Sequence, residues 1–283
     1  MYYLVDMYDG KLNFVENIEE TVCREILDAS DSVKETLEFY ALGKGFCDAW
    51  DQLILWSNTA NRDGNYMMRN LHTAEHLVRG FLFEFRTCLD HIETDIKRKY
   101  GEDSELWNIF KTGTGNAYDN FPEYAFTYHL RNCSQHCKNI VHGFIGNTGI
   151  GISSNVSLLL NDYKKWNAVD KQFMESSGPV LDLLAIFTVT FTAFNNSLKP
   201  VIQYLLNTNN TAQKLLYLRK WGDSLCKEFK HDVHCYHIAN IISCDGQVIP
   251  KENMSQGNVS VRIYPIDWSF IYELTDSIIE KGE

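Results

Sequence analysis

Positive charge is scarce in this sequence. Its 283 residues include 26 Lys and Arg against 37 Asp and Glu, which gives a net charge of -11 at pH 7. Proteins that coat nucleic acid or anionic membranes depend on many summed Lys and Arg contacts to phosphates. The charge balance therefore excludes that class, and any contact with nucleic acid should be local.

A long uninterrupted apolar run is also missing. The longest, GPVLDLLAIFTVTFTAF at residues 178–194, contains Asp182 and leaves about a dozen apolar or Thr residues after it, whereas a membrane-spanning helix needs roughly 20. The run therefore predicts a buried core helix, and we expect no membrane partner.

The cysteines form no dense framework. Eight of them are scattered between Cys23 and Cys244, without the close spacing of a small disulfide-bonded secreted domain. The first ten residues, MYYLVDMYDG, lack the basic segment and long apolar stretch of a secretion signal. We therefore expect a reduced, cytoplasmic protein.

Hydrophobic residues make up 45% of the chain and aromatic residues 13%, which is ample for a packed core. Short β-prone runs around Asp9-Gly10 predict a hairpin, helical periodicity follows, and later alternating residues predict a second small sheet before a last helix. The expected fold class is mainly α, a helical bundle with small β-hairpin or sheet elements at both termini. The expected segments are an N-terminal hairpin at 1–17, a helical domain at 18–230, and a small β element plus helix at 231–283, packed on the same domain.

One long amphipathic helix is predicted to end at Gly101, because apolar residues such as Phe81 and Phe85 recur at helical spacing before it. The basic residues KRK at 97–99 suit the C-terminal end of that helix, where they complement its dipole. Contact with an RNA backbone is the alternative interpretation of the same three residues.

Polar side chains crowd the segment YAFTYHLRNCSQHCKNIVHG, residues 124–143. Pro122 stands where a first helical turn begins, and Gly143 stands where a helix would stop. These two residues predict a motif helix over about 122–142.

Three of its residues suit cleavage of RNA. At about 100° per residue, Asn132 and His136 share a face, while Arg131 and His136 lie roughly 140° and about 7.5 Å apart, so only the long Arg side chain can bring both groups to one ligand. A guanidinium binds phosphate with paired N–H donors, and an imidazole exchanges protons near neutral pH. Together they could cut RNA without a metal or other cofactor, leaving a 2′,3′-cyclic phosphate and a 5′-OH.

The stretch LRNCSQH resembles the Arg-x-x-x-x-His motif of the HEPN superfamily, whose nuclease members often carry Asn directly after the Arg. Residues of about 79 to 139 are also similar to the long helix, basic Tyr-Gly ending, acidic loop and motif helix of a group of bacterial HEPN proteins. The resemblance implies a HEPN-like helical bundle. It also implies a metal-independent endoribonuclease that forms a homodimer with a composite active site. It assigns catalysis to Arg131 and His136, with Asn132 as the polar accessory.

The same resemblance implies a toxin or anti-phage defence effector, with RNA, tRNA among the candidates, as substrate and an antitoxin or sensor protein as a further partner. Some HEPN toxins carry a Tyr two residues beyond the His, as the target of nucleotide transfer from an antitoxin. Lys138 occupies that position here, which puts this form of regulation in doubt.

Aromatic residues of the motif helix could stack on unpaired bases. Tyr124 and Tyr128, four residues apart, share a face with Asn132 and Gln135, and are therefore the better candidates for the cleft. Tyr124, Tyr128, Gln135 and Lys138 form the predicted substrate-binding set.

Other interpretations remain for several polar clusters. His129, Cys133, His136 and Cys137 have zinc-binding residue types, but four ligands from one straight helix cannot surround a tetrahedral ion, so no metal site is expected. The stretch HDVHCYH at 231–237 lacks a paired second cluster and suits a structural role. The Gly-rich 146–155 lacks the ending of a phosphate-binding loop and suits a mobile connection.

The competing function is a non-catalytic HEPN module that binds nucleic acid, a nucleotide or a partner protein.

Overall fold

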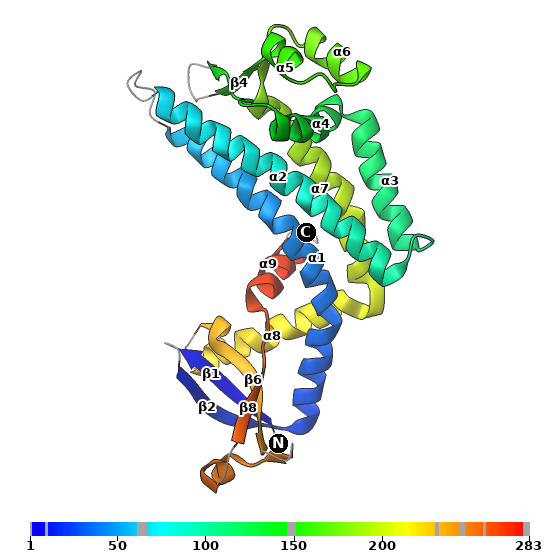
Figure 1. The fold of residues 1–283 in the computed structure, drawn as a ribbon. Helices are drawn as coiled ribbons and strands as arrows, with labels where there is room; N and C mark the ends of the chain where they lie inside the picture. Colours follow the sequence, from blue (N-terminus) through cyan, green and yellow to red (C-terminus); the bar gives the residue numbers. More distant parts are fainter. Residues whose placement is uncertain are drawn as a thin grey trace. The chain divides into compact units, whose positions relative to one another are not determined.

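The computed structural model of the protein describes residues 2–8, 11–60, 67–145, 151–229, 232–243, 247–256 and 259–279. The chain is mainly helical, as predicted, with small antiparallel sheets (Figure 1). It divides into two compact units, which we call the sheet unit (Met1–Tyr40 with Leu205–Glu283) and the helical unit (Ala41–Tyr204).

The sheet unit joins the two ends of the chain in one five-stranded sheet. Its elements are β1 (Tyr2–Tyr8), β2 (Lys11–Ile18), the first half of α1 (Glu20–Thr59), the 3-10 turn η2 (Thr208–Asn210), α8 (Thr211–Phe229), η3 (Val233–Cys235), β6 (Tyr236–Ser243), β7 (Val248–Ile249), η4 (Lys251–Gln256), β8 (Val259–Tyr264) and α9 (Trp268–Ile279). The predicted hairpin is confirmed by the antiparallel pairing of β1 with β2; its Asp9-Gly10 turn lies outside the described residues.

The predicted second sheet is wrong as a separate element. β1 pairs with β6, with Tyr3 opposite Ala239, and β6 pairs in turn with β8. Tyr3, Val5, Ala239 and Ile241 form a buried cluster on this sheet. The N-terminal strands therefore belong with the C-terminal ones, and the unit boundaries fall at Tyr40 and Tyr204 rather than at residues 17 and 230.

The helical unit contains the second half of α1, α2 (Met67–Tyr100), α3 (Glu105–Asn120), α4 (Pro122–His136), β3 (Gly143–Ile145), β4 (Gly151–Asn155), α5 (Val156–Asp162), α6 (Ala168–Ser176), β5 (Val180–Asp182) and most of α7 (Leu183–Asn207). The predicted long helix is confirmed as α2, and Gly101 ends it with φ 85°, a left-handed conformation that Gly adopts without strain. The apolar run at 178–194 forms β5 and then the first part of α7, so it is only partly helical. Part of the Gly-rich connection forms β4; residues 146–150 lie outside the described ranges.

An aromatic cluster holds α1, α2 and α7 together in the helical unit. Phe46 of α1 is fully buried and lies 4.8 Å from Phe81 of α2 and 4.5 Å from Phe194 of α7, measured between ring centroids. Rings at such distances and tilts pack favourably beyond the area that they bury. Helix α4 contacts both α2 and α6. The aromatic cluster therefore positions α2, one of the two helices against which α4 packs.

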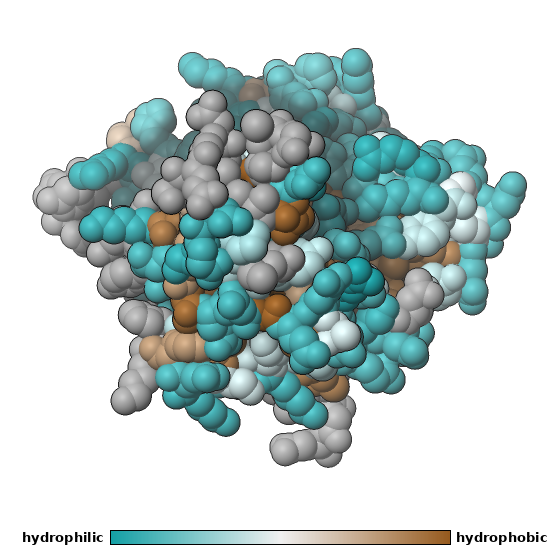
Figure 2. All heavy atoms as spheres, turned by 90° about the horizontal axis from the view of Figure 1, so that it is seen from below, coloured by the Kyte–Doolittle hydropathy of each residue, from teal (hydrophilic) through white to brown (hydrophobic). Residues whose placement is uncertain are grey.

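No helix in the described part of the chain combines the length and the hydropathy that a membrane span requires. Figure 2 shows one face of the molecule, on which hydrophilic residues predominate and hydrophobic ones form small separate patches.

Candidate functional site

The predicted motif helix is α4, and it is shorter than expected. It begins at Pro122, which suits a first helical position because its missing N–H needs no intrahelical partner. It ends at His136 rather than near residue 142, because Cys137 has extended backbone angles (φ -96°, ψ 147°). His136 therefore lies in the last turn, at the point where the chain leaves the helix.

Two residues of α2 hold this exit segment. Arg79 donates hydrogen bonds to the carbonyl oxygens of Ser134, Cys137 (3.0 Å) and Lys138 (3.1 Å), which satisfies acceptors that a helix end leaves free. One carboxylate oxygen of Glu75, Oε1, forms an ion pair with Arg79 at 2.6 Å.

The second carboxylate oxygen of Glu75 accepts the backbone N–H groups of Ile140 at 2.9 Å and Val141 at 2.7 Å. Both residues are buried. The Glu75–Arg79 pair thus bonds to five backbone groups of residues 134–141 and explains why the helix stops early. We call this pair the exit clamp.

The chain beyond the clamp is fixed by β4. The Ser154 hydroxyl donates to the Ile140 carbonyl at 2.7 Å, and the backbone N–H of Asn155 donates to Nδ1 of His142 at 3.1 Å. An imidazole nitrogen that accepts an N–H is unprotonated. Burial lowers the pKa of His142, which favours the same neutral form.

The predicted catalytic residues lie at the surface end of α4. His136 and Gln135 are exposed, while Arg131 and Asn132 are half-buried. The Arg131 guanidinium donates to the Gln135 side-chain oxygen at 3.0 Å, and the His136 ring stacks on Tyr163, with centroids 6.0 Å apart and planes 11° apart.

Among the described residues, Arg131 and His136 form no hydrogen bond with each other. Their side chains are instead each held by one uncharged neighbour. In the described part of the chain neither side chain forms an ion pair, so each stays available to an anionic ligand.

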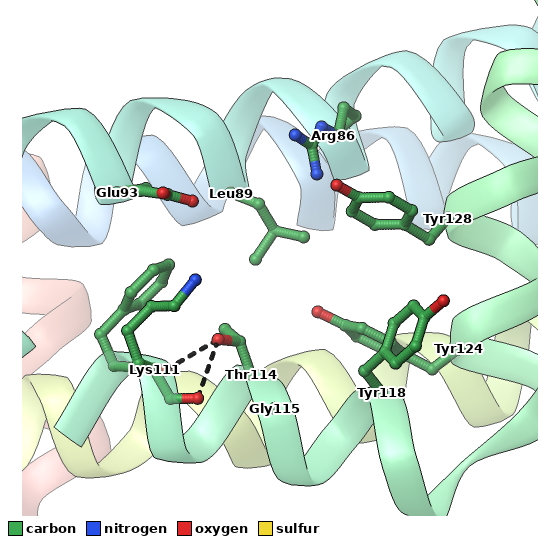
Figure 3. A pocket seen from close by; sticks show the side chains of 10 residues that line it. Arg86, Leu89, Glu93, Lys111, Thr114, Gly115, Tyr118, Tyr124 and Tyr128 are labelled. Carbon is green, nitrogen blue, oxygen red and sulfur yellow. Dashed lines mark hydrogen bonds between the residues drawn. The ribbon is translucent and has the colours of Figure 1, made fainter. Parts of the chain in front are cut away.

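The predicted substrate-binding residues are divided between two places. Gln135 and Lys138 are exposed at the end of α4, near the catalytic residues in sequence. Tyr124 and Tyr128 instead line a cavity between α2, α3 and α4 (Figure 3), and neither Arg131 nor His136 is among its lining residues.

The basic run at 97–99 is engaged with its own neighbours. Lys97 forms ion pairs with Glu93 (3.2 Å) and Glu102 (3.1 Å), and Arg98 pairs with Asp95 (2.7 Å). These contacts match the interpretation of a solvated helix end.

The proposed zinc-type residues of α4 have other partners. His129 donates from Nδ1 to the buried carboxylate of Asp170 at 2.9 Å, and its Nε2 shares a hydrogen bond with the Tyr118 hydroxyl at 3.3 Å. Cys133 and Cys137 are buried, with sulfurs 3.0 Å apart. Within the described ranges no group of three or more His, Cys, Asp or Glu residues is arranged to hold a metal ion.

Sequence reasoning missed the exit clamp and the partners of His129. Glu75 and Arg79 are four residues apart on α2, a spacing that signals an ion pair. Nothing in that spacing indicates that the pair also binds a segment about 60 residues later. Asp170 is an ordinary helix residue in sequence and becomes notable only through its burial, at 2% exposure.

Comparison with known proteins leaves the family open. No protein-family profile matches the chain, and neither the curated proteins nor the solved structures include a significant match. The chemistry of the site therefore has to be argued from its own residues. An exposed imidazole and an unpaired guanidinium near one helix end can bind a phosphodiester and move protons on it.

Proposed function

We propose that this protein is a metal-independent endoribonuclease of the HEPN type. His136 acts on the proton of a ribose 2′-OH or of the leaving 5′-oxygen, and Arg131 binds the phosphate and stabilises its added negative charge. The 2′-oxygen attacks phosphorus, the bond to the 5′-oxygen breaks, and the products carry a 2′,3′-cyclic phosphate and a 5′-OH. Asn132 is the polar accessory to this pair.

The observation that carries the proposal is the placement of Arg131 and His136 at an accessible helix end whose backbone is fixed. A general base must be exposed to substrate and held in place. The exit clamp holds the backbone beside His136, and the stack on Tyr163 holds its ring. Gln135 orients Arg131 without neutralising it, so the guanidinium keeps its charge for phosphate.

The proposal includes a homodimer in which the motif ends of two copies form one composite site. In-line cleavage uses a base at the 2′-OH and an acid at the leaving 5′-oxygen, and one protomer supplies a single His136. A second copy would supply a second His136 and a second Arg131. The net charge of -11 restricts RNA contact to this local set, since the rest of the surface repels the backbone. A structured RNA such as tRNA, met at a few points, suits that restriction, and the biological setting would be that of a toxin or defence effector under an antitoxin or sensor protein.

Purified full-length protein, incubated with total cellular RNA in excess EDTA, tests the proposal. Wild type should cut and leave cyclic phosphate ends, while His136→Ala and Arg131→Ala should each lose at least roughly a hundredfold in rate. His91→Ala, which changes an exposed histidine of α2, is the matched control and should cut like wild type.

Intact RNA with a folded, dimeric wild-type protein would favour the non-catalytic binding module instead. Equal cutting by wild type and His136→Ala would reject His136 as the catalytic base. Cutting that EDTA abolishes would reject the metal-free mechanism.

A further inference from the structure

The cavity between α2, α3 and α4 has features of a binding site for a small molecule. Its volume is 370 Å³, and its lining includes the apolar side chains of Leu89 and Phe110 and the rings of Tyr118, Tyr124 and Tyr128. Small-molecule sites range over roughly 300–1,000 Å³ and combine apolar walls with a few convergent polar groups. All the lining residues belong to the helical unit.

The hydroxyl of Tyr124 is the first of those polar groups. The residue is only 2% exposed, and its hydroxyl has no hydrogen-bond partner among the residues that the structure describes. Figure 3 shows this hydroxyl pointing into the middle of the cavity. Burial raises the pKa of Tyr124, so the phenol keeps its proton and can donate it in a hydrogen bond. A buried hydroxyl without a partner destabilises the protein, and a ligand oxygen at this point would satisfy it.

The ammonium group of Lys111 is the second. It also points toward the cavity in Figure 3. Its nitrogen lies 5.3 Å from the centroid of the Trp107 ring, and among the described residues no carboxylate forms an ion pair with it. The other charged residues of the lining have ion-pair partners: Arg86 binds Asp90 at 2.7 Å, and Glu93 binds Lys97 at 3.2 Å, a lysine that Glu102 also binds. Lys111 is therefore the one cation of the lining that no described carboxylate binds, and an anionic ligand could supply the missing partner.

The cavity walls are suited to a flat ring. Leu89 and Tyr124 are buried, and the guanidinium carbon of Arg86 lies 4.3 Å from the centroid of the Tyr128 ring, which holds that ring in place. An aromatic ligand can pack edge-on or offset against such rings. One free positive charge, one donating hydroxyl and apolar aromatic walls together fit a monoanion that carries a ring.

We propose that this cavity binds a small aromatic carboxylate. The carboxylate lies between the Lys111 ammonium and the Tyr124 hydroxyl, and the ring packs against Leu89 and the tyrosine side chains. This binding function goes beyond RNA cleavage and does not depend on it, since neither Arg131 nor His136 lines the cavity.

Ligand-observed NMR on the full chain tests the proposal with 3-phenylpropanoate as the probe. Saturable binding is expected with a dissociation constant of roughly 1 mM, which a ligand of about ten heavy atoms can reach. Three compounds alter the recognised groups: 3-phenylpropanol replaces the carboxylate with an uncharged hydroxyl, 3-cyclohexylpropanoate replaces the aromatic ring with a saturated one, and phenyl phosphate replaces the propanoate chain with a dianionic phosphate. Each should bind more weakly than the probe.

Two variants locate the binding. Tyr124→Phe removes one hydrogen bond and Lys111→Gln removes the positive charge, and each should weaken binding roughly three- to tenfold. Both should fold, because the Tyr124 hydroxyl has no partner to lose and Lys111 is exposed. Tyr217→Phe and Lys220→Gln make the same chemical changes on α8 and should leave binding unchanged.

The proposal is overturned if the probe fails to bind saturably, or if the α8 variants weaken it as much as the cavity variants do. Tighter binding of phenyl phosphate, with the same dependence on Lys111, would reject the carboxylate in favour of a dianion. If 3-phenylpropanol bound as tightly as 3-phenylpropanoate, the negative charge would have no role in binding, and the proposed carboxylate site would be rejected.

Discussion

Replacing Glu75 should show how far the motif end depends on the exit clamp. Glu75→Ala leaves the buried N–H groups of Ile140 and Val141 without an acceptor and removes the partner of Arg79. An unsatisfied buried group costs about 1–3 kcal/mol, so the two together cost about 2–6 kcal/mol. The Glu75 side chain is only 15% exposed, so water replaces its oxygens poorly. Glu75→Gln keeps a neutral acceptor and should cost about 1–2 kcal/mol.

Urea unfolding followed by circular dichroism measures these free energies, and RNA cleavage well below the melting temperature measures the effect on the site. We expect Glu75→Ala to lose cleavage beyond the loss of folded protein, because residues 137–141 no longer hold the last turn that carries His136. Asp90→Ala breaks a partly exposed ion pair of the same spacing on α2 and should cost at most about 1 kcal/mol. The reasoning is refuted if Glu75→Ala is no less stable than Asp90→Ala, or if the Gln and Ala variants lose equal stability.

Two further predictions concern the helical unit. Gly113→Ala on α3 would place a Cβ 2.4 Å from the carbonyl oxygen of Ser197 on α7, and because backbone cannot yield as a side chain does, we expect a net loss of about 1–3 kcal/mol. A Cβ at Gly115 would meet nothing within 4 Å, so Gly115→Ala should raise the free energy of unfolding by up to about 1 kcal/mol. If the urea midpoints of both variants shifted in the same direction, the predicted clash at Gly113 would be contradicted. The folded chain holds His142 neutral with a lowered pKa, so the unfolded chain binds that proton more readily, and stability should fall as the pH drops below about 6.5. Urea midpoints measured from pH 7.5 to 5 should fall less steeply for His142→Gln than for wild type. An unchanged slope would assign the pH dependence to other groups.

Periodicity predicted the elements of the fold much better than their partners. α2 follows from a repeating apolar face with a Gly stop, and the N-terminal hairpin follows from two alternating runs around a turn signal. The pairing of β1 with β6 joins segments more than 200 residues apart, and no local pattern encodes which strand edge another strand will find. The sheet of β3, β4 and β5 was missed because its strands have three to five residues, too few for alternation to be recognised.

The site was predictable where a single helix carries it. The spacing of Arg131 and His136 on α4 required only helical geometry. The end of α4 was misplaced because Gly143 was taken as the stop, whereas the stop comes from Glu75 and Arg79 on another helix. Side-chain partners supplied through tertiary contacts cannot be read from the motif segment alone.

The polar residues of α4 can now be separated by whether the helical unit already supplies their partners. Thr127 bonds to Thr190 of α7 at 2.8 Å, and His129 is bound by the buried carboxylate of Asp170, so packing is a sufficient reason for both. Among the described residues, the Arg131 side chain bonds to an uncharged amide and the His136 ring stacks on an aromatic ring, and these partners give no reason for a cation and a titratable imidazole there. Surface charge that the fold does not need is where ligand binding is the better explanation. The same criterion selects the Tyr124 hydroxyl in the cavity, since it is buried without a partner and the fold would be more stable without it.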